Sequence, residues 1–216
     1  MTTTYAIREC GNCGLRYPLT EGHSFGTRCP SCLGETHVVL TRQLDFEGKS
    51  SNDLTPGPSP FRRGELSALL DNIRSAWNVG SIFRTADGFG LKHLHLCGIT
   101  PTPDTESVKK TSLGAEETVA WTYAKNACLK GQELKSKGYK LFALEEDRRS
   151  IPIQNAGGIT NERIVLVTGN EVTGVDPDLL DLCDKVLFIP MSGNKKSFNV
   201  AVAFAVAAFT LSSQDK

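Results

Sequence analysis

The chain has 216 residues, of which 39% are hydrophobic and 22% are charged, as is typical of a folded globular protein. Lysine plus arginine equals aspartate plus glutamate at 24 each, so a strongly basic nucleic-acid-binding protein is excluded, although local basic patches are not. No apolar run reaches the roughly 20 residues of a membrane helix, and residues 1–10 lack the apolar core of a signal peptide. We therefore expect a cytoplasmic protein without a membrane segment.

The N-terminal segment contains two Cys-x-x-Cys pairs, Cys10 with Cys13 and Cys29 with Cys32, and fifteen residues separate them. This spacing is typical of a structural zinc site, because four thiolates close a tetrahedral shell. The segment has too few apolar residues for a core, so the metal would supply much of its folding energy. Free thiols, a redox pair and a rubredoxin-like iron are the alternatives to zinc. We predict a small zinc-ribbon domain over residues 1–47.

Arginine and aromatic side chains lie between these cysteines, among them Arg8, Arg16, Tyr17 and Arg28. Such side chains suit contact with a nucleic-acid backbone or stacking on a base. A purely structural or protein-contacting role for the ribbon is an equal alternative.

The segment after the ribbon, residues 48–64, is rich in serine, proline and glycine and is predicted to be a linker. In the second domain, residues 65–216, strand-like and helix-like segments alternate. That alternation predicts an α/β class, a parallel sheet with helices on both faces. The predicted strands are 66–70, 91–98, 119–123, 140–144, 164–167 and 186–189, and the predicted helices are 79–89, 107–114, 126–137, 178–182 and 199–211.

Two of these helices carry further information. Asn78 is of a residue type that suits the N-cap of helix 79–89, and Gly90 is placed to end it. The last helix, 199–211, is apolar on nearly every face, so it must be buried on more than one side. A homodimer interface through this helix would cover it.

Strands 164–167 and 186–189 are each followed by a loop that contains glycine, 168–174 and 190–196. In open α/β sheets, ligands bind at the carboxyl ends of the strands. The two loops therefore predict one pocket built largely from backbone groups. The loop of Gly169 and Gly174 has neither the GKS/T ending of a phosphate loop nor the G-x-G-x-x-G of a dinucleotide site.

Three spaced motifs follow one another in this domain. They are Asn78-x-Gly80-x-x-x-Arg84, Gly169-x-Glu171-x-x-Gly174, and the stretch from Ile189 to Val200, IPMSGNKKSFNV. In this order and at these separations, the set resembles the SpoU (TrmH-like) branch of the SPOUT RNA methyltransferases over roughly residues 65–211. Phe198 stands where leucine is more usual, and the ribbon replaces other substrate-binding extensions.

The resemblance implies a fold with a C-terminal trefoil knot, an exception to the rule that chains are unknotted. It implies that S-adenosylmethionine binds in the knot, that the protein is a homodimer, and that it methylates a ribose 2′-hydroxyl in tRNA or rRNA. By motif match, the implied catalytic side chains are Arg84, Asn78, Ser197 and Asn199, and the implied cofactor-binding residues are Gly169, Glu171, Gly174, Ile189, Met191 and Phe198.

The roles of individual side chains stay open at this point. Arg84 either helps to remove the hydroxyl proton or holds a phosphate and stabilises the developing alkoxide; guanidinium groups resist deprotonation, which favours the second role. Glu171 either acts as a base or accepts backbone N–H bonds that fix its loop, and we favour the second. We expect His93 and His95 to face opposite ways on their strand and not to pair as ligands.

Three other functions compete with ribose methylation. The first is methyl transfer to a base or another substrate by the same fold. The second is a catalytically silent RNA-binding protein that uses the ribbon and a SPOUT-like domain. The third is a zinc-ribbon interaction module attached to an unrelated α/β domain.

Overall fold

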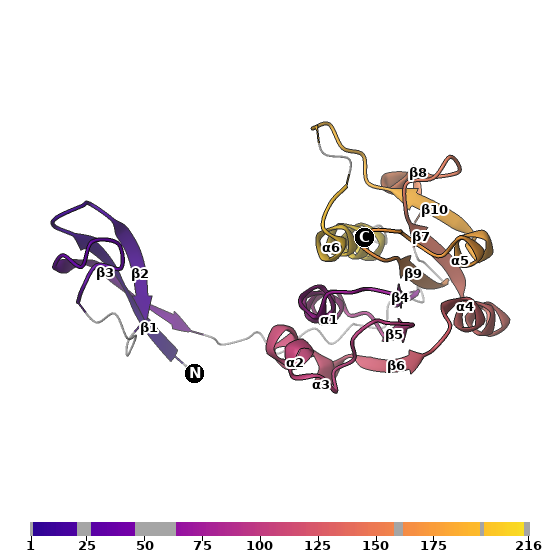
Figure 1. The fold of residues 1–216 in the computed structure, drawn as a ribbon, viewed down its shortest axis with the longest axis horizontal. Helices are drawn as coiled ribbons and strands as arrows, with labels where there is room; N and C mark the ends of the chain where they lie inside the picture. The colour runs from indigo at the N-terminus through magenta and orange to yellow at the C-terminus, as the bar shows by residue number, and fades with distance from the viewer. Residues whose placement is uncertain (1, 21–26, 46–63, 158–161, 195–196, 214–216) are drawn as a thin grey trace, which may run out of the picture. The chain divides into compact units, whose positions relative to one another are not determined.

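The computed structural model describes residues 2–20, 27–45, 64–157, 162–194 and 197–213. The chain divides into two compact units, residues 1–58 and 59–216 (Figure 1). The predicted linker, residues 48–64, lies outside the described residues except for Gly64, so the predicted domain boundaries stay predictions.

The first unit is a three-stranded antiparallel sheet in the order β2-β1-β3. Its strands are β1 (Thr2–Cys10), β2 (Arg16–Thr20) and β3 (Thr36–Asp45). Two matching turns follow Cys10 and Cys29: the N–H of Gly14 donates to the carbonyl of Cys10 at 2.9 Å, and that of Leu33 donates to the carbonyl of Cys29 at 3.0 Å. The turns therefore bring the second cysteine of each pair back toward the first.

The second unit is built on a seven-stranded sheet in the order β6-β5-β4-β9-β7-β10-β8, and all its pairings are parallel. Because every strand runs the same way, all the carboxyl ends lie along one edge. The strands are β4 (Glu65–Asp71), β5 (His93–Cys97), β6 (Ala120–Ala124), β7 (Lys140–Leu144), β8 (Ile151–Pro152), β9 (Arg163–Thr168) and β10 (Lys185–Phe188).

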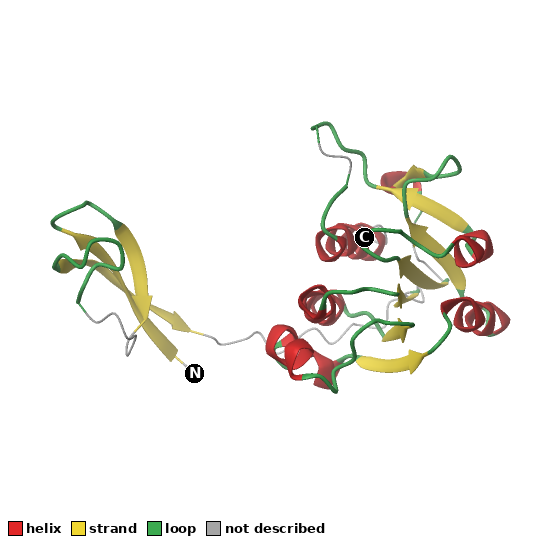
Figure 2. Ribbon diagram, in the orientation of Figure 1, coloured by secondary structure: helices red, strands yellow, loops and turns green. Residues whose placement is uncertain are grey.

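Helices cover both faces of this sheet (Figures 1 and 2). One hydrophobic core cluster lies between the sheet and the helices α1 and α6. A second cluster lies between the opposite face of the sheet and the helices α4 and α5. Along β9, Ile164 and Leu166 belong to the first cluster, whereas Val165 and Val167 belong to the second, as the period of two in a strand requires. The helices are α1 (Ala76–Phe89), α2 (Glu106–Ser112), α3 (Ala115–Thr118), α4 (Ala127–Ser136), α5 (Pro177–Leu182), α6 (Val200–Ser213) and the 3-10 helix Ile153–Asn155.

The α/β class, with a parallel sheet and helices on both faces, is thus confirmed, and the C-terminal trefoil knot stays a prediction. None of the described helices combines the length and the apolar character needed to cross a bilayer.

Two local predictions are wrong. The helix predicted to begin after Asn78 begins at Ala76, and its N-cap is Ser75, whose hydroxyl accepts the N–H of Asn78 at 3.4 Å. His93 and His95 share one face of β5, because residues two positions apart on a strand point the same way. Their ring centroids are 4.3 Å apart, and a ring nitrogen of each lies 3.0 Å from the hydroxyl of Thr122.

Gly80 has a packing role that explains its place in the first motif. A Cβ atom at this position would lie 2.8 Å from the backbone nitrogen of Ser112 and would collide with the side chain of Thr111. The absence of a side chain therefore lets α1 pack closely on α2. Gly88, in the same helix, has open space around its position.

We expect Gly80→Ala to lower the free energy of unfolding by about 1–3 kcal/mol, the usual cost of overpacking a rigid contact. The matched control, Gly88→Ala, should be neutral or stabilise by up to about 1 kcal/mol, because alanine is the better helix former. Urea denaturation of both variants measures the difference. Equal stabilities would show that α1 and α2 are not in close contact.

Candidate active site

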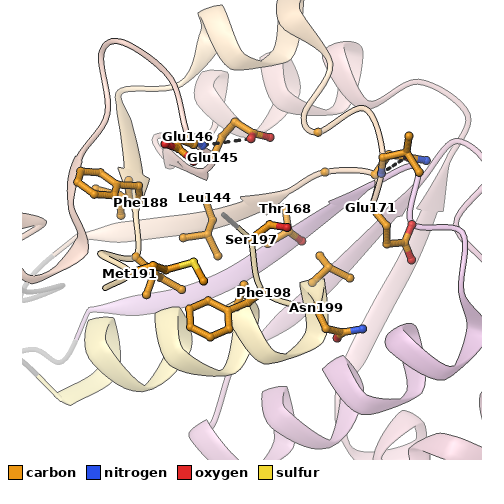
Figure 3. A pocket seen from close by; sticks show the side chains of 18 of the residues that line it. Leu144, Glu145, Glu146, Thr168, Glu171, Phe188, Met191, Ser197, Phe198 and Asn199 are labelled. Carbon is orange, nitrogen blue, oxygen red and sulfur yellow. Dashed lines mark hydrogen bonds between the residues drawn. The ribbon is translucent and has the colours of Figure 1, made fainter. Parts of the chain in front are cut away.

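A pocket of about 670 Å³ lies at the carboxyl edge of the sheet, beyond the ends of β7, β9 and β10 (Figure 3). This volume falls in the range of about 300–1,000 Å³ that small-molecule sites occupy. The pocket brings together both loops predicted to form it. Its lining residues are Leu144, Glu145, Glu146, Thr168, Gly169, Asn170, Glu171, Val172, Gly174, Leu187, Phe188, Ile189, Met191, Gly193, Ser197, Phe198, Asn199, Val200 and Ala203.

The turn after β9 can form only because of its two glycines. The backbones of Asn170 and Gly174 exchange hydrogen bonds of 3.0 and 2.9 Å, which closes the turn. A Cβ at Gly169 would collide with the backbone of Gly174 and Val175. Gly174 has a φ of +74°, a left-handed conformation that other residues adopt only with strain. The second motif therefore encodes a tight turn at the pocket wall.

Glu145, which the sequence analysis missed, connects two walls of the pocket. Its carboxylate accepts the N–H of Val175 at 3.0 Å and the N–H of Glu146 at 3.1 Å. A Cβ at Gly174 would collide with the same carboxylate. The signal was present in the sequence, because Glu145 directly follows a predicted strand whose carboxyl end faces the pocket.

A hydrogen-bonded network joins the three motifs. Glu171 accepts the side-chain N–H of Asn78 at 2.8 Å, and Asn199 donates its side-chain N–H to the Asn78 oxygen at 3.0 Å. Glu171 also accepts the backbone N–H groups of Arg74 at 2.9 Å and Ser75 at 3.1 Å. These two bonds satisfy N–H groups just before α1, and they fix the start of that helix against the turn after β9.

The bonds to Glu171 also determine its ionisation. Partial burial favours the neutral acid, but the N–H groups of Arg74, Asn78 and Ser75 outweigh it and hold the pKa of Glu171 below its usual value. The carboxylate is therefore charged at neutral pH. The hydrogen bonds to this carboxylate therefore stabilise the folded protein at neutral pH. That stabilisation is lost as the pH falls through the lowered pKa of Glu171 and the carboxylate is protonated. This geometry matches a fixing role for Glu171, as we expected.

The implied catalytic residues do not all lie in the pocket. Ser197 and Asn199 line it, and Asn78 touches it through Asn199. Arg84 is exposed and is not among the described residues that line the pocket. All six implied cofactor-binding residues line the pocket: Gly169, Glu171, Gly174, Ile189, Met191 and Phe198.

The chemistry of the pocket fits S-adenosylmethionine. Leu144, Ile189 and Met191 offer apolar surface to an adenine ring, and the loops offer backbone groups. Three glutamates line the cavity. The described lining residues include no lysine or arginine. That charge suits a sulfonium cation without a phosphate better than it suits a nucleotide.

The four cysteines of the first unit form one cluster, and their sulfur atoms all lie within 4.8 Å of one another. The Sγ atoms of Cys10 and Cys32 are 3.5 Å apart, and those of Cys13 and Cys29 are 3.7 Å apart. A tetrahedral zinc with bonds of about 2.3 Å places its sulfur ligands about 3.8 Å apart. Gly34 leaves room here, because a Cβ would lie 3.2 Å from two of these sulfur atoms. The cluster therefore fits a structural zinc ion.

Comparison with known proteins shows the family of the second unit. The sequence signature of the SpoU rRNA Methylase family matches residues 65–209. The chain belongs to this family. The tRNA (guanosine(18)-2′-O)-methyltransferase of Thermus thermophilus is 32% identical over 150 residues, which are 68% of this chain and 74% of that protein. The family match, residues 65–209, excludes the ribbon.

Solved structures of RNA-modifying enzymes support the fold of the second unit. The Aquifex aeolicus TrmH/SpoU tRNA modifying enzyme aligns with a TM-score of 0.62 and 26% identity, over 71% of this chain and 76% of that chain. An AdoMet-bound rRNA methyltransferase from Sinorhizobium meliloti aligns with a TM-score of 0.63 and 25% identity, over 69% of this chain and 56% of that one.

Proposed function

We propose that this SpoU-family protein transfers a methyl group from S-adenosylmethionine to a ribose 2′-hydroxyl of tRNA or rRNA. The observation that carries the proposal is the Glu171–Asn78–Asn199 network, which joins all three family motifs at the pocket. A silent RNA-binding protein would have no need to keep these polar side chains together.

Since tRNA and rRNA are the substrates, we propose that the protein acts in the cytoplasm.

In the proposed reaction, the sulfonium supplies an activated methyl group. The carbon–sulfur bond breaks as the ribose oxygen bonds to carbon, and the hydroxyl proton leaves to solvent. Positioning contributes much to the rate of such a displacement. We assign that positioning to Ser197 and Asn199, which lie at the pocket wall before α6. Asn78 and Glu171 hold Asn199 in place.

The cofactor part of this proposal is tested by calorimetric titration of the full chain, at known zinc content, with S-adenosylmethionine. We expect saturable binding of one cofactor per chain. A folded, zinc-loaded protein that does not bind the cofactor would contradict the proposal.

We further propose that the protein is a homodimer through α6 and α1. Val202, Val206 and Phe209 of α6 are 49%, 37% and 56% exposed, and they follow one face of the helix. Phe209 is 5.8 Å, ring centre to ring centre, from Phe89 of α1. Trp77, on α1, is 73% exposed. The exposed side chains of Val202, Val206 and Phe209 on α6, with Phe89 of α1 beside Phe209, form apolar surface of the kind that marks protein interfaces.

We expect Phe209→Asp to convert the dimer to a monomer, because the interface would then have to bury an unpaired charge. Sedimentation velocity at micromolar concentration measures the change. The matched control is Leu129→Asp, at a 63% exposed position on α4, which should not alter the association state. A monomeric wild-type protein would refute the dimer.

The position of Arg84 fits action on the partner's pocket rather than its own. Arg84 follows Trp77 by seven residues, so both lie on one exposed face of α1. Asn78, which reaches the chain's own pocket, lies on a different face. We therefore propose that a dimer through this surface brings Arg84 to RNA bound at the partner's site, where it holds a phosphate and stabilises the developing alkoxide.

For the ribbon, we propose a structural or protein-contacting role rather than binding to RNA phosphates. Residues 1–47 contain four arginines, no lysine and five carboxylates. With a zinc ion and four thiolates, the net charge of the ribbon is about −3, which disfavours binding to a phosphate backbone.

We propose that residues 1–47 and 65–216 are separate domains joined by 48–64.

A further inference from the structure

Thr168 is a buried pocket residue whose hydroxyl has no partner among the described residues. It is the last residue of β9, and its exposed fraction is 1%. Within the part of the chain that the structure describes, no group donates to or accepts from its Oγ1 atom. An unpaired buried hydroxyl lowers stability, so an unsatisfied group of this kind needs an explanation.

The position of Thr168 indicates a ligand as the missing partner. Alternation along β9 puts its side chain on the same face as Leu166, the face covered by α1 and α6. In the sheet register it pairs with Leu144 of β7, which also lines the pocket. Figure 3 shows Thr168 in the middle of the pocket, between Leu144 and Glu171. Thr168 therefore lies beside Leu144, an apolar residue of the pocket, which suits contact with an adenosine.

We propose that Thr168 Oγ1 forms a hydrogen bond with the adenosine half of the bound cofactor and contributes to its selection. A hydroxyl both donates and accepts, so it can pair with an adenine nitrogen or with a ribose hydroxyl. This inference rests on the proposed function, because it takes the ligand to be S-adenosylmethionine.

The test is Thr168→Val, which keeps the shape of the side chain and removes the hydroxyl. We expect the dissociation constant of S-adenosylhomocysteine, measured by calorimetry, to rise by about 3- to 10-fold, the usual effect of one lost hydrogen bond. The midpoint of thermal unfolding without ligand should stay the same or rise, because an unpaired buried group is removed. Thr168→Ser, which keeps the hydroxyl, should bind within about twofold of wild type.

Ser67 provides a matched control. Its hydroxyl is also buried and unpartnered among the described residues, but it lies on β4, on the face of Leu69, and does not line the pocket. Ser67→Ala should therefore leave the affinity for S-adenosylhomocysteine unchanged. If the affinity fell equally in both variants, a general loss of packing would be the cause, and the proposal would be overturned.

A second probe, 5′-methylthioadenosine, locates the contact, because it keeps the adenosine and lacks the amino-acid tail. If Thr168→Val weakens the affinity for both probes by the same factor, the adenosine contact is supported. If only the affinity for S-adenosylhomocysteine falls, the proposal is overturned. If wild type binds and Thr168→Val binds equally well, this inference fails while the proposed function stands. If wild type binds neither S-adenosylmethionine nor S-adenosylhomocysteine, both fail.

Discussion

Replacement of Arg84 by alanine is expected to lower the rate of methyl transfer by about 100- to 1,000-fold, the usual effect of removing a group that stabilises developing negative charge. Cofactor affinity should stay within about twofold of wild type, because Arg84 does not line the pocket in its own chain. Single-turnover transfer of labelled methyl, together with calorimetry, measures both quantities. Lys92→Ala, which removes another exposed cation of the second unit, should keep full activity.

Mixed dimers decide whether Arg84 acts on the partner's site. Arg84→Ala and Asn199→Ala subunits are each expected to be inactive alone. In a co-expressed mixture, about half of the dimers are mixed, and each contains one site with both residues intact if Arg84 acts across the interface. The mixture should then recover about one quarter of wild-type activity. No recovery would place Arg84 in its own site, and full activity of Arg84→Ala alone would remove it from the mechanism.

Loss of two zinc ligands is expected to unfold the ribbon and leave the catalytic unit intact. In Cys13→Ser combined with Cys29→Ser, the ribbon loses a metal whose binding supplies about 10–16 kcal/mol in comparable peptides, far more than so small a core can replace. We expect the bound zinc to fall from one per chain to nearly none, as measured by atomic emission. The affinity for S-adenosylmethionine should not change.

The control for this experiment is Cys128→Ser, outside the cysteine cluster, which should retain one zinc per chain. RNA affinity of the double variant tests the role of the ribbon. An unchanged affinity for RNA agrees with a structural or protein-contacting ribbon. A tenfold lower affinity for RNA would show that the ribbon binds the RNA substrate. Zinc retained by the double variant would contradict the assignment of its ligands.

Two strands next to the pocket were predictable because the runs 164–167 and 186–189 are short, continuously apolar and bounded by turn residues. The others were predicted from the alternation of strand-like and helix-like segments. The strand predicted over 140–144 is β7, Lys140–Leu144, with the same bounds. Three small elements of the second unit were missed: β8 has two residues, the 3-10 helix Ile153–Asn155 has three and α3 has four, too few to show a period. The start of α1 was misplaced because serine and asparagine are both good N-caps. The carboxylate that fixes this start, Glu171, lies 96 residues beyond Ser75.

The site was predictable in composition but not in its connections. The loops named from the sequence do form one pocket, since parallel strands end along one edge of a sheet. The bond between Asn78 and Asn199 spans 121 residues, and no local pattern indicates it. Thr168 is a further case, because only the packing around a hydroxyl shows whether it has a partner. Glu145 was also missed, but the same strand-end argument that located the pocket could have found it, because Glu145 directly follows β7.

The central claim is tested most directly by following the methyl group. The protein is incubated with methyl-labelled S-adenosylmethionine and with tRNA and rRNA from cells that lack this protein, and the RNA is digested to nucleosides for mass spectrometry. We predict label in a 2′-O-methylnucleoside, at a site that resists alkaline cleavage, and no label with Asn199→Ala. Label on a base, or none from a protein that binds the cofactor, would contradict ribose methylation.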